Sequence, residues 1–303
     1  MDMLDIYTDY LICQNKYATA TGLSDMVDGE FSHDKVTRFL RQGDFDSKML
    51  WQYVKPAVRQ RENQNGVLIL DDSIEDKPYT DENEVNCWHY SHAKGDIVKG
   101  INFLSCMVRY DDFCLPIGYE IIKKDIQYCD IKTKQHRRKA TVNKNQHFRQ
   151  LIQQACTNHV LFEWVLADNW FGSKDNMEFI HDDLQKSFIF GIKSNRTLVL
   201  SENDAKNGRY QQVRSLELEE GVVYKAWLKG LAFPVQLLKK VFKNETTGTL
   251  YLVSNNIHFS AERLYEVYQK RWRIEEFHKS IKQNASLEKS PTKKVKTQCN
   301  TAS

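Results

Sequence analysis

The sequence GVLILDDSIEDK, residues 66–77, holds a short apolar run that is followed by two adjacent acids. The run Val67–Leu70 contains only Val, Leu and Ile, which is typical of a strand buried within a sheet. Asp71 and Asp72 come directly after it. An acid at the carboxyl end of such a strand lies at the rim of the sheet, where open α/β folds place their chemistry. Equally often, an Asp in this position only forms a turn or caps a helix.

A second segment repeats this pattern. The sequence HVLFEWVLADNWFGS, residues 159–173, contains another apolar run that ends at Asp168. Two buried strands that each end in an acid predict an α/β fold with carboxylates at one edge of the sheet.

A third carboxylate comes from the sequence YQKRWRIEEFHKSIK, residues 268–282. Tyr268, Arg271, Glu275 and Lys282 project within roughly 60° of one another on a helix with about 100° per residue. The apolar residues of the neighbouring side are Val267, Ile274, Phe277 and Ile281. A carboxylate placed so can hold a hard metal ion, and the flanking cations can hold phosphates. An ordinary amphipathic helix with solvated charges is the alternative, and it is the commoner case for a charged helix.

Together these segments resemble the DDE transposases of bacterial insertion sequences, in the group that carries the Tyr-Arg-Glu-Lys helix signature. The signature Tyr268-x2-Arg271-x3-Glu275-x6-Lys282 is complete, and the two strand-borne acids precede it in the right order. The resemblance runs from about residue 66 to the C-terminus, with a fainter similarity over the N-terminal helices.

The fold class that we predict is α/β, with a ribonuclease-H-like catalytic core, a β-strand insertion and an N-terminal helical region. Residues 66–200 read as β-β-β-α-β-α-β. The expected strands are near 67–70, 98–109, 114–123, 161–167 and 187–193, and the expected helices are at 145–158 and 174–184. Three strands followed by alternating helices and strands is the order of a ribonuclease-H-like fold, which the family resemblance also implies.

The region from about 198 to 256 breaks this rhythm with short strands. Turns are expected at Asn207-Gly208, Glu220-Gly221 and Thr247-Gly248. The spacing of 107 positions from Asp168 to Glu275 is too long for a bare core, so we interpret this region as the β insertion that similar transposases carry. Trp227 lies within it and could stack on an unpaired base, although a core Trp is the commoner case. The catalytic helix is expected to begin after Ser260 as its N-cap.

The N-terminal residues 1–62 form a helical region, and residues 63–303 form the catalytic domain. Within 18–40 the pattern is a helix, a break at Gly29 and a second helix capped by Ser32, as in a helix-turn-helix. Its exposed side would carry Lys35, Arg38 and Arg41. Since residues 1–62 hold ten acids against eight bases, a helical bundle packed on the core is an equally good interpretation.

Composition excludes several other classes. Seven cysteines without a CxxC pair argue against a disulfide framework or a structural zinc site and suit a reducing cytoplasm. No run of 18 apolar residues and no basic-then-apolar leader is present, so we expect no membrane span and no signal peptide. The net charge is only +3, but residues 123–149 hold nine Lys or Arg and two Asp. We expect this stretch to contact a phosphate backbone, and the protein to be cytoplasmic and associated with the bacterial nucleoid.

The resemblance implies strand cleavage and strand transfer at the ends of an insertion sequence. Asp71, Asp168 and Glu275 would bind two Mg²⁺ ions, for which Mn²⁺ can substitute. Asp71 is preferred over Asp72 because Asp71, Asp72 and Ser73 match an Asp-x-Ser/Thr pattern and because strand alternation puts only one acid on the metal side. The partners would be terminal inverted repeats and target DNA, bound by a homodimer.

Four residues are predicted DNA contacts in this scheme. They are Tyr268, Arg271, Lys282 and Trp227. His89 and His92 could assist near the cut strand, although a structural role is commoner for such histidines.

Two other interpretations stay open. The end SPTKKVKTQCNTAS lacks the further apolar helix of similar transposases, which suggests a truncated copy that only binds element ends and represses transposition. A ribonuclease H or general nuclease would explain the three carboxylates, but neither the insertion nor the complete helix signature.

Overall fold

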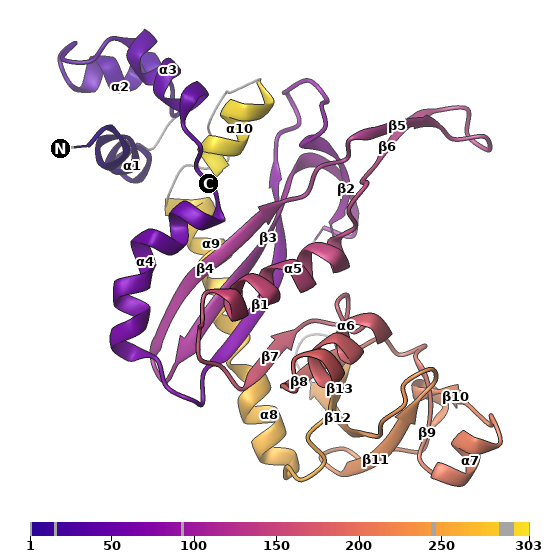
Figure 1. Cartoon of the computed structure of the whole chain (residues 1–303). Helices are drawn as coiled ribbons and strands as arrows, with labels where there is room; N and C mark the ends of the chain where they lie inside the picture. Colours follow the sequence, from indigo (N-terminus) through magenta and orange to yellow (C-terminus); the bar gives the residue numbers. More distant parts are fainter. Residues whose placement is uncertain (1, 15–16, 92–93, 244–246, 285–293, 303) are drawn as a thin grey trace.

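The computed structural model of the protein describes residues 2–14, 17–91, 94–243, 247–284 and 294–302. A mixed β-sheet runs through the molecule (Figure 1). Its central strands are β1 (Val67–Asp76), β3 (Asp96–Tyr110), β4 (Phe113–Ile121), β7 (Trp164–Ala167) and β8 (Ser187–Ile192). They lie in the order β4-β3-β1-β7-β8, with β1 antiparallel to β3 and parallel to β7, and β7 parallel to β8. The prediction of an α/β, ribonuclease-H-like fold is confirmed.

Strand β1 is longer than its apolar run. Its parallel pairing with β7 covers Val67–Ile69, but its antiparallel pairing with β3 continues to Asp76. The expectation that Asp71 and Asp72 follow the end of this strand is therefore wrong, because both acids lie within it. The rim of the sheet exists only on the β7 side, where β7 ends at Ala167 and exposes the edge of β1.

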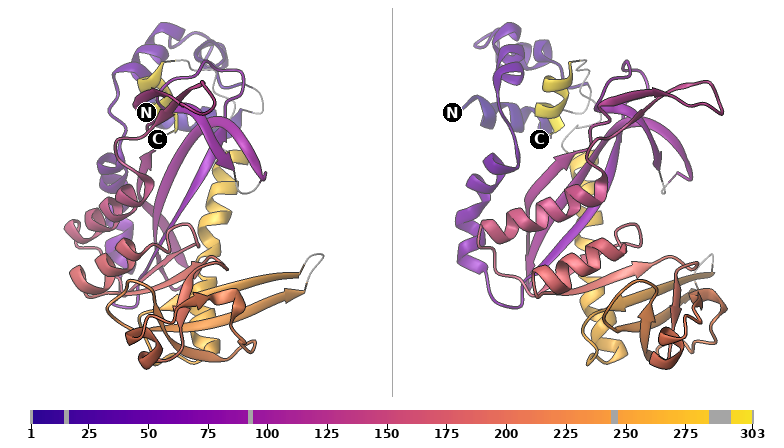
Figure 2. Two further views of the ribbon diagram at one scale, coloured as in Figure 1. Left: turned by 90° about the vertical axis from the view of Figure 1, so that its right-hand side faces the viewer. Right: turned by 45° about the vertical axis from the view of Figure 1, so that its right-hand side comes forward.

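Helices cover both faces of the sheet (Figures 1 and 2). One face carries α4 (Ser47–Arg61), α5 (Lys144–Thr157) and α6 (Lys174–Glu178), which continues as a π-helical turn over Phe179–Asp183. The other face carries α8 (Ala261–Gln269) and α9 (Trp272–Asn284). Alternation along β1 sends Leu68 and Leu70 to the first face and Val67 and Ile69 to the second. Each such burial stabilises the fold by about 1.5–3 kcal/mol.

The predicted insertion extends this sheet. It contains β9 (Thr197–Val199), α7 (Glu202–Lys206), β10 (Gln211–Gln212), a short 3-10 turn (Val213–Ser215), β11 (Val223–Leu228), β12 (Val235–Lys243) and β13 (Thr247–Ser254). Strand β13 pairs antiparallel with β8, so the insertion shares the core of the catalytic domain. The turns at Gly208 and Gly221 are confirmed by their positive φ angles. The turn at Thr247-Gly248 is wrong, because these residues begin β13.

Three strands of the structure were not predicted from the sequence. Strand β2 (Asn86–Ser91) pairs with the start of β3, and β5 (Ile126–Cys129) pairs with β6 (His136–Lys139). The β5–β6 ribbon projects from the body of the molecule (Figures 1 and 2). Most of its residues are exposed, and it carries most of the basic stretch. Because it buries no apolar face, it has no hydrophobic period that could reveal it.

The N-terminal helices α1 (Met3–Cys13), α2 (Ala20–Met26) and α3 (His33–Gln42) form a small core of their own. The predicted break and cap are confirmed: Gly29 has φ of 78°, and the Ser32 hydroxyl accepts a bond from the Lys35 backbone N–H. A final helix, α10 (Val295–Ala302), packs on α3, where the Asn300 amide donates to the carbonyls of Leu40 and Gly43 at 2.7 and 2.6 Å. A further helix is thus present where none was expected. Within the described ranges, no helix is both long enough and apolar enough to cross a bilayer.

Candidate active site

Asp71 and Asp168 are brought together by the parallel pair β1 and β7. The register aligns Ile69 with Leu166, so two residues further on Asp71 lies level with Asp168, the first residue after β7. Both carboxylates line one cavity of about 770 Å³, and Glu275 of α9 lines it too. Burial and then the charge of Asp168 raise the pKa of Asp71 to about 7. The pKa of Asp168 is also raised, mainly by burial. These two carboxylates therefore resist carrying full charge together unless a cation joins them.

Asp72 lies on the opposite face of β1 from Asp71, as strand alternation requires. Its Oδ2 accepts hydrogen bonds from Lys144 Nζ and Asn102 Nδ2, both at 2.7 Å. Lys144 is the first residue of α5, which packs on that face. The two adjacent acids thus have different surroundings.

The helix that was predicted as one element is broken. Ser260 caps α8 as expected, accepting from the Arg263 backbone N–H at 3.2 Å. However, α8 ends at Gln269 and α9 begins at Trp272. The N–H groups of Lys270 and Arg271 donate three residues back rather than four, which tightens the chain between the helices. The prediction of a continuous helix is wrong here, and Arg271 lies at the junction.

Arg271 joins two of the predicted metal ligands. Its Nη1 donates to Asp71 Oδ2 at 2.9 Å, and its Nη2 donates to Glu275 Oε1. The guanidinium carbon lies 5.7 Å from the centre of the Tyr268 ring, and the Arg271 side chain is only 12% exposed. The guanidinium is thus a buried cation between a carboxylate of the sheet and a carboxylate of the helix.

The side chains predicted to contact DNA are more buried than the sequence led us to expect, or are already hydrogen-bonded. Tyr268 is 4% exposed within the core beneath α8. Lys282 Nζ donates to the carbonyl of Ile74 in β1 at 2.6 Å. Trp227 is partly buried on β11, with Lys225 Nζ 5.3 Å from its ring, and it does not line the acidic cavity. The roles of these residues at DNA stay predictions.

His278 is a site residue that the sequence interpretation missed. It lies one helical turn after Glu275, lines the cavity and approaches Ser105 Oγ with its Nε2 at 3.1 Å. Burial and then the charge of Lys282 lower its pKa to about 4, so it is a neutral imidazole. Its spacing of three from Glu275 was the signal that could have identified it.

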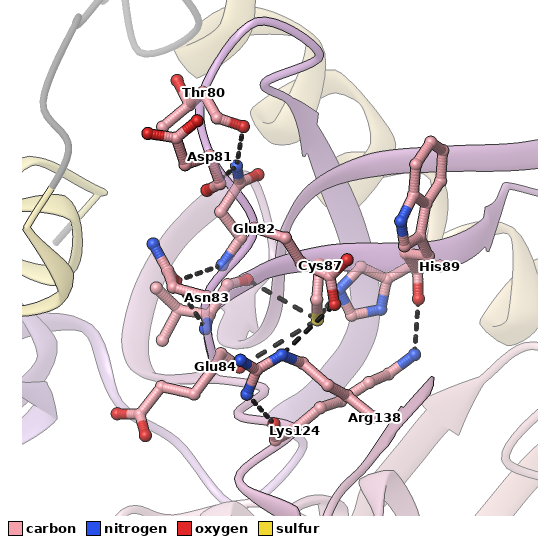
Figure 3. Close-up of polar contacts among 12 residues, drawn as sticks. Thr80, Asp81, Glu82, Asn83, Glu84, Cys87, His89, Lys124 and Arg138 are labelled. Atoms are coloured by element: carbon pink, nitrogen blue, oxygen red, sulfur yellow. Dashed lines mark hydrogen bonds and ion pairs between the residues drawn. The ribbon is translucent and has the colours of Figure 1, made fainter. Parts of the chain in front are cut away.

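His89 lines the same cavity, and Figure 3 shows its polar contacts with neighbouring side chains. Its Nε2 lies 3.3 Å from Cys87 Sγ, and burial lowers its pKa to about 3. Nearby, Lys124 Nζ donates to the Trp88 carbonyl at 2.5 Å, and Arg138 pairs with Glu82 at 3.2 Å. These contacts tie the base of the β5–β6 ribbon to β2. His92 lies outside the described residues.

The donor set suits a hard divalent cation. Asp71, Asp168 and Glu275 supply carboxylate oxygens, which Mg²⁺ and Mn²⁺ prefer. Yet among the described residues no three His, Cys, Asp or Glu side chains are grouped around one point as a metal site. The Arg271 guanidinium donates to both Asp71 and Glu275. In chemical kind, these oxygen ligands fit a hard divalent cation.

A ribonuclease-H-like sheet with paired carboxylates at the end of β7 defines a class of enzymes that cleave phosphodiesters. Residues 1–217 match the family model described as DDE superfamily endonuclease. The chain belongs to this family, whose members use divalent metal ions and act on DNA. A search of curated proteins gave no match. The family match includes Asp71 and Asp168 but ends before α8 and α9, so it does not test the helix signature.

Proposed function

We propose that the protein is a DNA transposase that cuts the ends of an insertion sequence and joins them to target DNA. The observation that carries this proposal is the convergence of Asp71, Asp168 and Glu275 on one cavity in a DDE endonuclease fold. The completeness of the signature from Tyr268 to Lys282 supports a transposase over a general nuclease.

Asp71, Asp168 and Glu275 would hold two Mg²⁺ ions. When bound, such ions stabilise the attacking and leaving oxygens of phosphodiester transfer. Asp71 and Asp168 belong to neighbouring strands, so the sheet fixes their separation. Glu275 belongs to a helix and its side chain is 50% exposed, so in this proposal it is the ligand that moves.

In the absence of other cations, Arg271 partly neutralises the charges of Asp71 and Glu275. It must release Asp71 and Glu275 before these carboxylates can take up metal, and its freed guanidinium can then bind a phosphate bidentately. Tyr268 would support Arg271 in either position, because its ring lies under the guanidinium. We therefore propose that DNA binding and metal binding both require the Arg271 side chain to move.

The test is a cleavage assay on DNA that flanks the gene. A supercoiled plasmid carrying the flanking inverted repeats should be nicked at the repeat ends with Mg²⁺ or Mn²⁺, and a plasmid without the repeats should not. Asp168→Asn should abolish nicking while leaving binding to the repeats intact. Nicking of both plasmids alike would indicate a general nuclease. Binding without nicking by the wild-type protein would instead support a DNA-binding repressor.

A further inference from the structure

Trp170 lies at the mouth of the active-site cavity, where neither the predictions nor the proposed mechanism uses it. It follows β7 by three residues, and its backbone N–H donates to Asp168 Oδ1 at 2.9 Å. Its side chain is one of the exposed large aromatics, at 41% exposure, and it lines the same cavity as Asp71 and Glu275. One short turn therefore carries both a proposed metal ligand and an accessible indole.

Two lysines from different elements place their ammonium groups over this indole ring. Lys144 Nζ, at the start of α5, is 5.2 Å from the ring centre, and Lys193 Nζ, directly after β8, is 4.9 Å from it. Both distances are within the range of a cation–π contact. Lys144 also pairs with Asp72 at 2.7 Å, whereas Lys193 is exposed. Three separate segments thus converge on one indole, and two of them each contribute an ammonium group that lies over its ring.

The turn that holds Trp170 is packed tightly against β8. A side chain added at Gly191 would place its Cβ 3.0 Å from the backbone nitrogen of Asn169, and one added at Gly172 would lie 2.6 Å from the Gly191 carbonyl. Only glycine fits such close approaches of backbone to backbone. The indole is therefore presented on a backbone that is fixed before any ligand arrives, which lowers the entropic cost of binding.

An exposed indole beside lysines suits a nucleotide whose base is unpaired. The π-face can stack on any base, and the ammonium groups can donate hydrogen bonds to the flanking phosphates. A base within a duplex is stacked on its neighbours, so it cannot use such a platform unless it leaves the stack. The cavity volume of about 770 Å³ lies within the range of sites that enclose small ligands.

We propose that Trp170, Lys144 and Lys193 form a subsite that binds an unpaired nucleotide of the DNA strand next to the cut. The adjacent phosphates draw the two ammonium groups away from the ring, and the base stacks on the indole face that they leave. This inference rests on the proposed function, since it places the subsite beside the carboxylates that would act on the same strand. The subsite would orient the strand end and favour DNA that frays at the site of cleavage.

The test is a binding experiment that distinguishes the contribution of the DNA bases from that of the phosphate backbone. A fluorescein-labelled oligothymidylate and an abasic oligonucleotide of equal length are titrated by anisotropy in EDTA, so that no cleavage occurs. We expect Trp170→Ala to weaken oligothymidylate binding by roughly 5- to 150-fold and to leave abasic binding unchanged. Trp170→Phe, which keeps an aromatic face, should retain most of the affinity.

A matched control is Trp88→Ala. Trp88 is 52% exposed and has Lys99 Nζ 6.0 Å from its ring, but it does not line the active-site cavity. This variant should bind both oligonucleotides as the wild type does. Lys193→Ala should weaken binding of both, with a salt dependence that is shallower by about one unit of slope.

Several outcomes overturn the subsite. They are an equal loss on both oligonucleotides with Trp170→Ala, no loss on either, or the same loss with Trp88→Ala. The plasmid assay keeps this result distinct from the proposed function. If the wild type nicks repeat ends while Trp170→Ala shows no base-dependent loss, only the subsite is wrong. If Trp170→Ala loses only oligothymidylate binding and the wild type never nicks, the subsite stands and the transposase proposal fails.

Discussion

Asp71 and Asp72 are neighbours on one strand and line one cavity, yet the fold gives their side chains different partners. Asp71 faces α9, close to a second carboxylate, and its pKa is raised to about 7. Asp72 faces α5 and receives hydrogen bonds from Lys144 and Asn102. The difference shows that two adjacent acids of one strand can take different partners: Asp71 is paired with an arginine, and Asp72 with a lysine and an asparagine amide. The two faces of β1 can be tested against each other.

The largest effect should come from exchanging each acid for its amide. Asp71→Asn should lower plasmid nicking by roughly 10³-fold or more, because loss of a metal ligand removes several kcal/mol of transition-state stabilisation. Asp72→Asn should lower it far less, since Asp72 holds Lys144 rather than a metal. Nicking rates of both variants at saturating Mn²⁺ would decide this. If Asp72→Asn is the inactive variant, Asp72 and not Asp71 is the metal ligand.

The second effect concerns the stability of the metal-free protein. Arg271→Met leaves Asp71 and Glu275 without their shared cation and should cost about 3 kcal/mol, the low end for breaking a buried pair, since Asp71 can protonate. Lys144→Met on the other face should cost less, because Asp72 keeps its bond from Asn102. Urea unfolding in EDTA measures both losses.

A double variant checks the cause of that loss. In the Asp71→Asn/Arg271→Met protein no buried charge is left at this position of β1, so part of the lost stability should return. A double variant no more stable than Arg271→Met would show that the guanidinium stabilises the helix junction by packing, and that its bond to Asp71 contributes little.

The third effect is a pH dependence on the Asp72 side, where His89 is buried. Its pKa is about 3 in the folded protein and about 6.5 when unfolded. Above pH 6.5 the imidazole is neutral in both states. As the pH falls below 6.5 only the unfolded state gains the proton, so stability falls, by about 2 kcal/mol between pH 6.5 and 5. The His89→Gln variant should lose correspondingly less stability over that interval in thermal melts. Parallel curves for the two proteins would show that His89 is as hydrated as in the unfolded chain.

The smallest effect separates two kinds of cation. Lys282 on the Asp71 face already donates to the Ile74 carbonyl at 2.6 Å. Arg137 of the projecting ribbon is half-exposed, and its ion pair with Asp130 is longer, at 3.6 Å. Arg137→Ala should therefore reduce the salt slope of DNA binding by about one unit, and Lys282→Ala should leave it unchanged. The measurement is a titration of duplex DNA at several salt concentrations. A shallower slope for Lys282→Ala would support the DNA contact that the helix signature predicts.

The sequence by itself determined the core of this protein. The apolar runs before Asp71 and Asp168 predicted the neighbouring strands, because buried parallel strands need continuous apolar residues. The order of the elements predicted the ribonuclease-H-like fold, and the glycines predicted the turns at Gly208 and Gly221. These features depend on local chemistry, which a single segment already contains.

Other features were decided only by tertiary structure. The strand β1 runs past its apolar residues because β3 continues to pair with it, and the β5–β6 ribbon exists through pairing alone. The break at Arg271 brings its guanidinium between Asp71 and Glu275, which are 204 residues apart in the chain. The proposed subsite at Trp170 includes one lysine from the start of α5 and one that follows β8. Each of these depends on which distant segment lies beside a residue, and that is a property of packing which no local pattern carries.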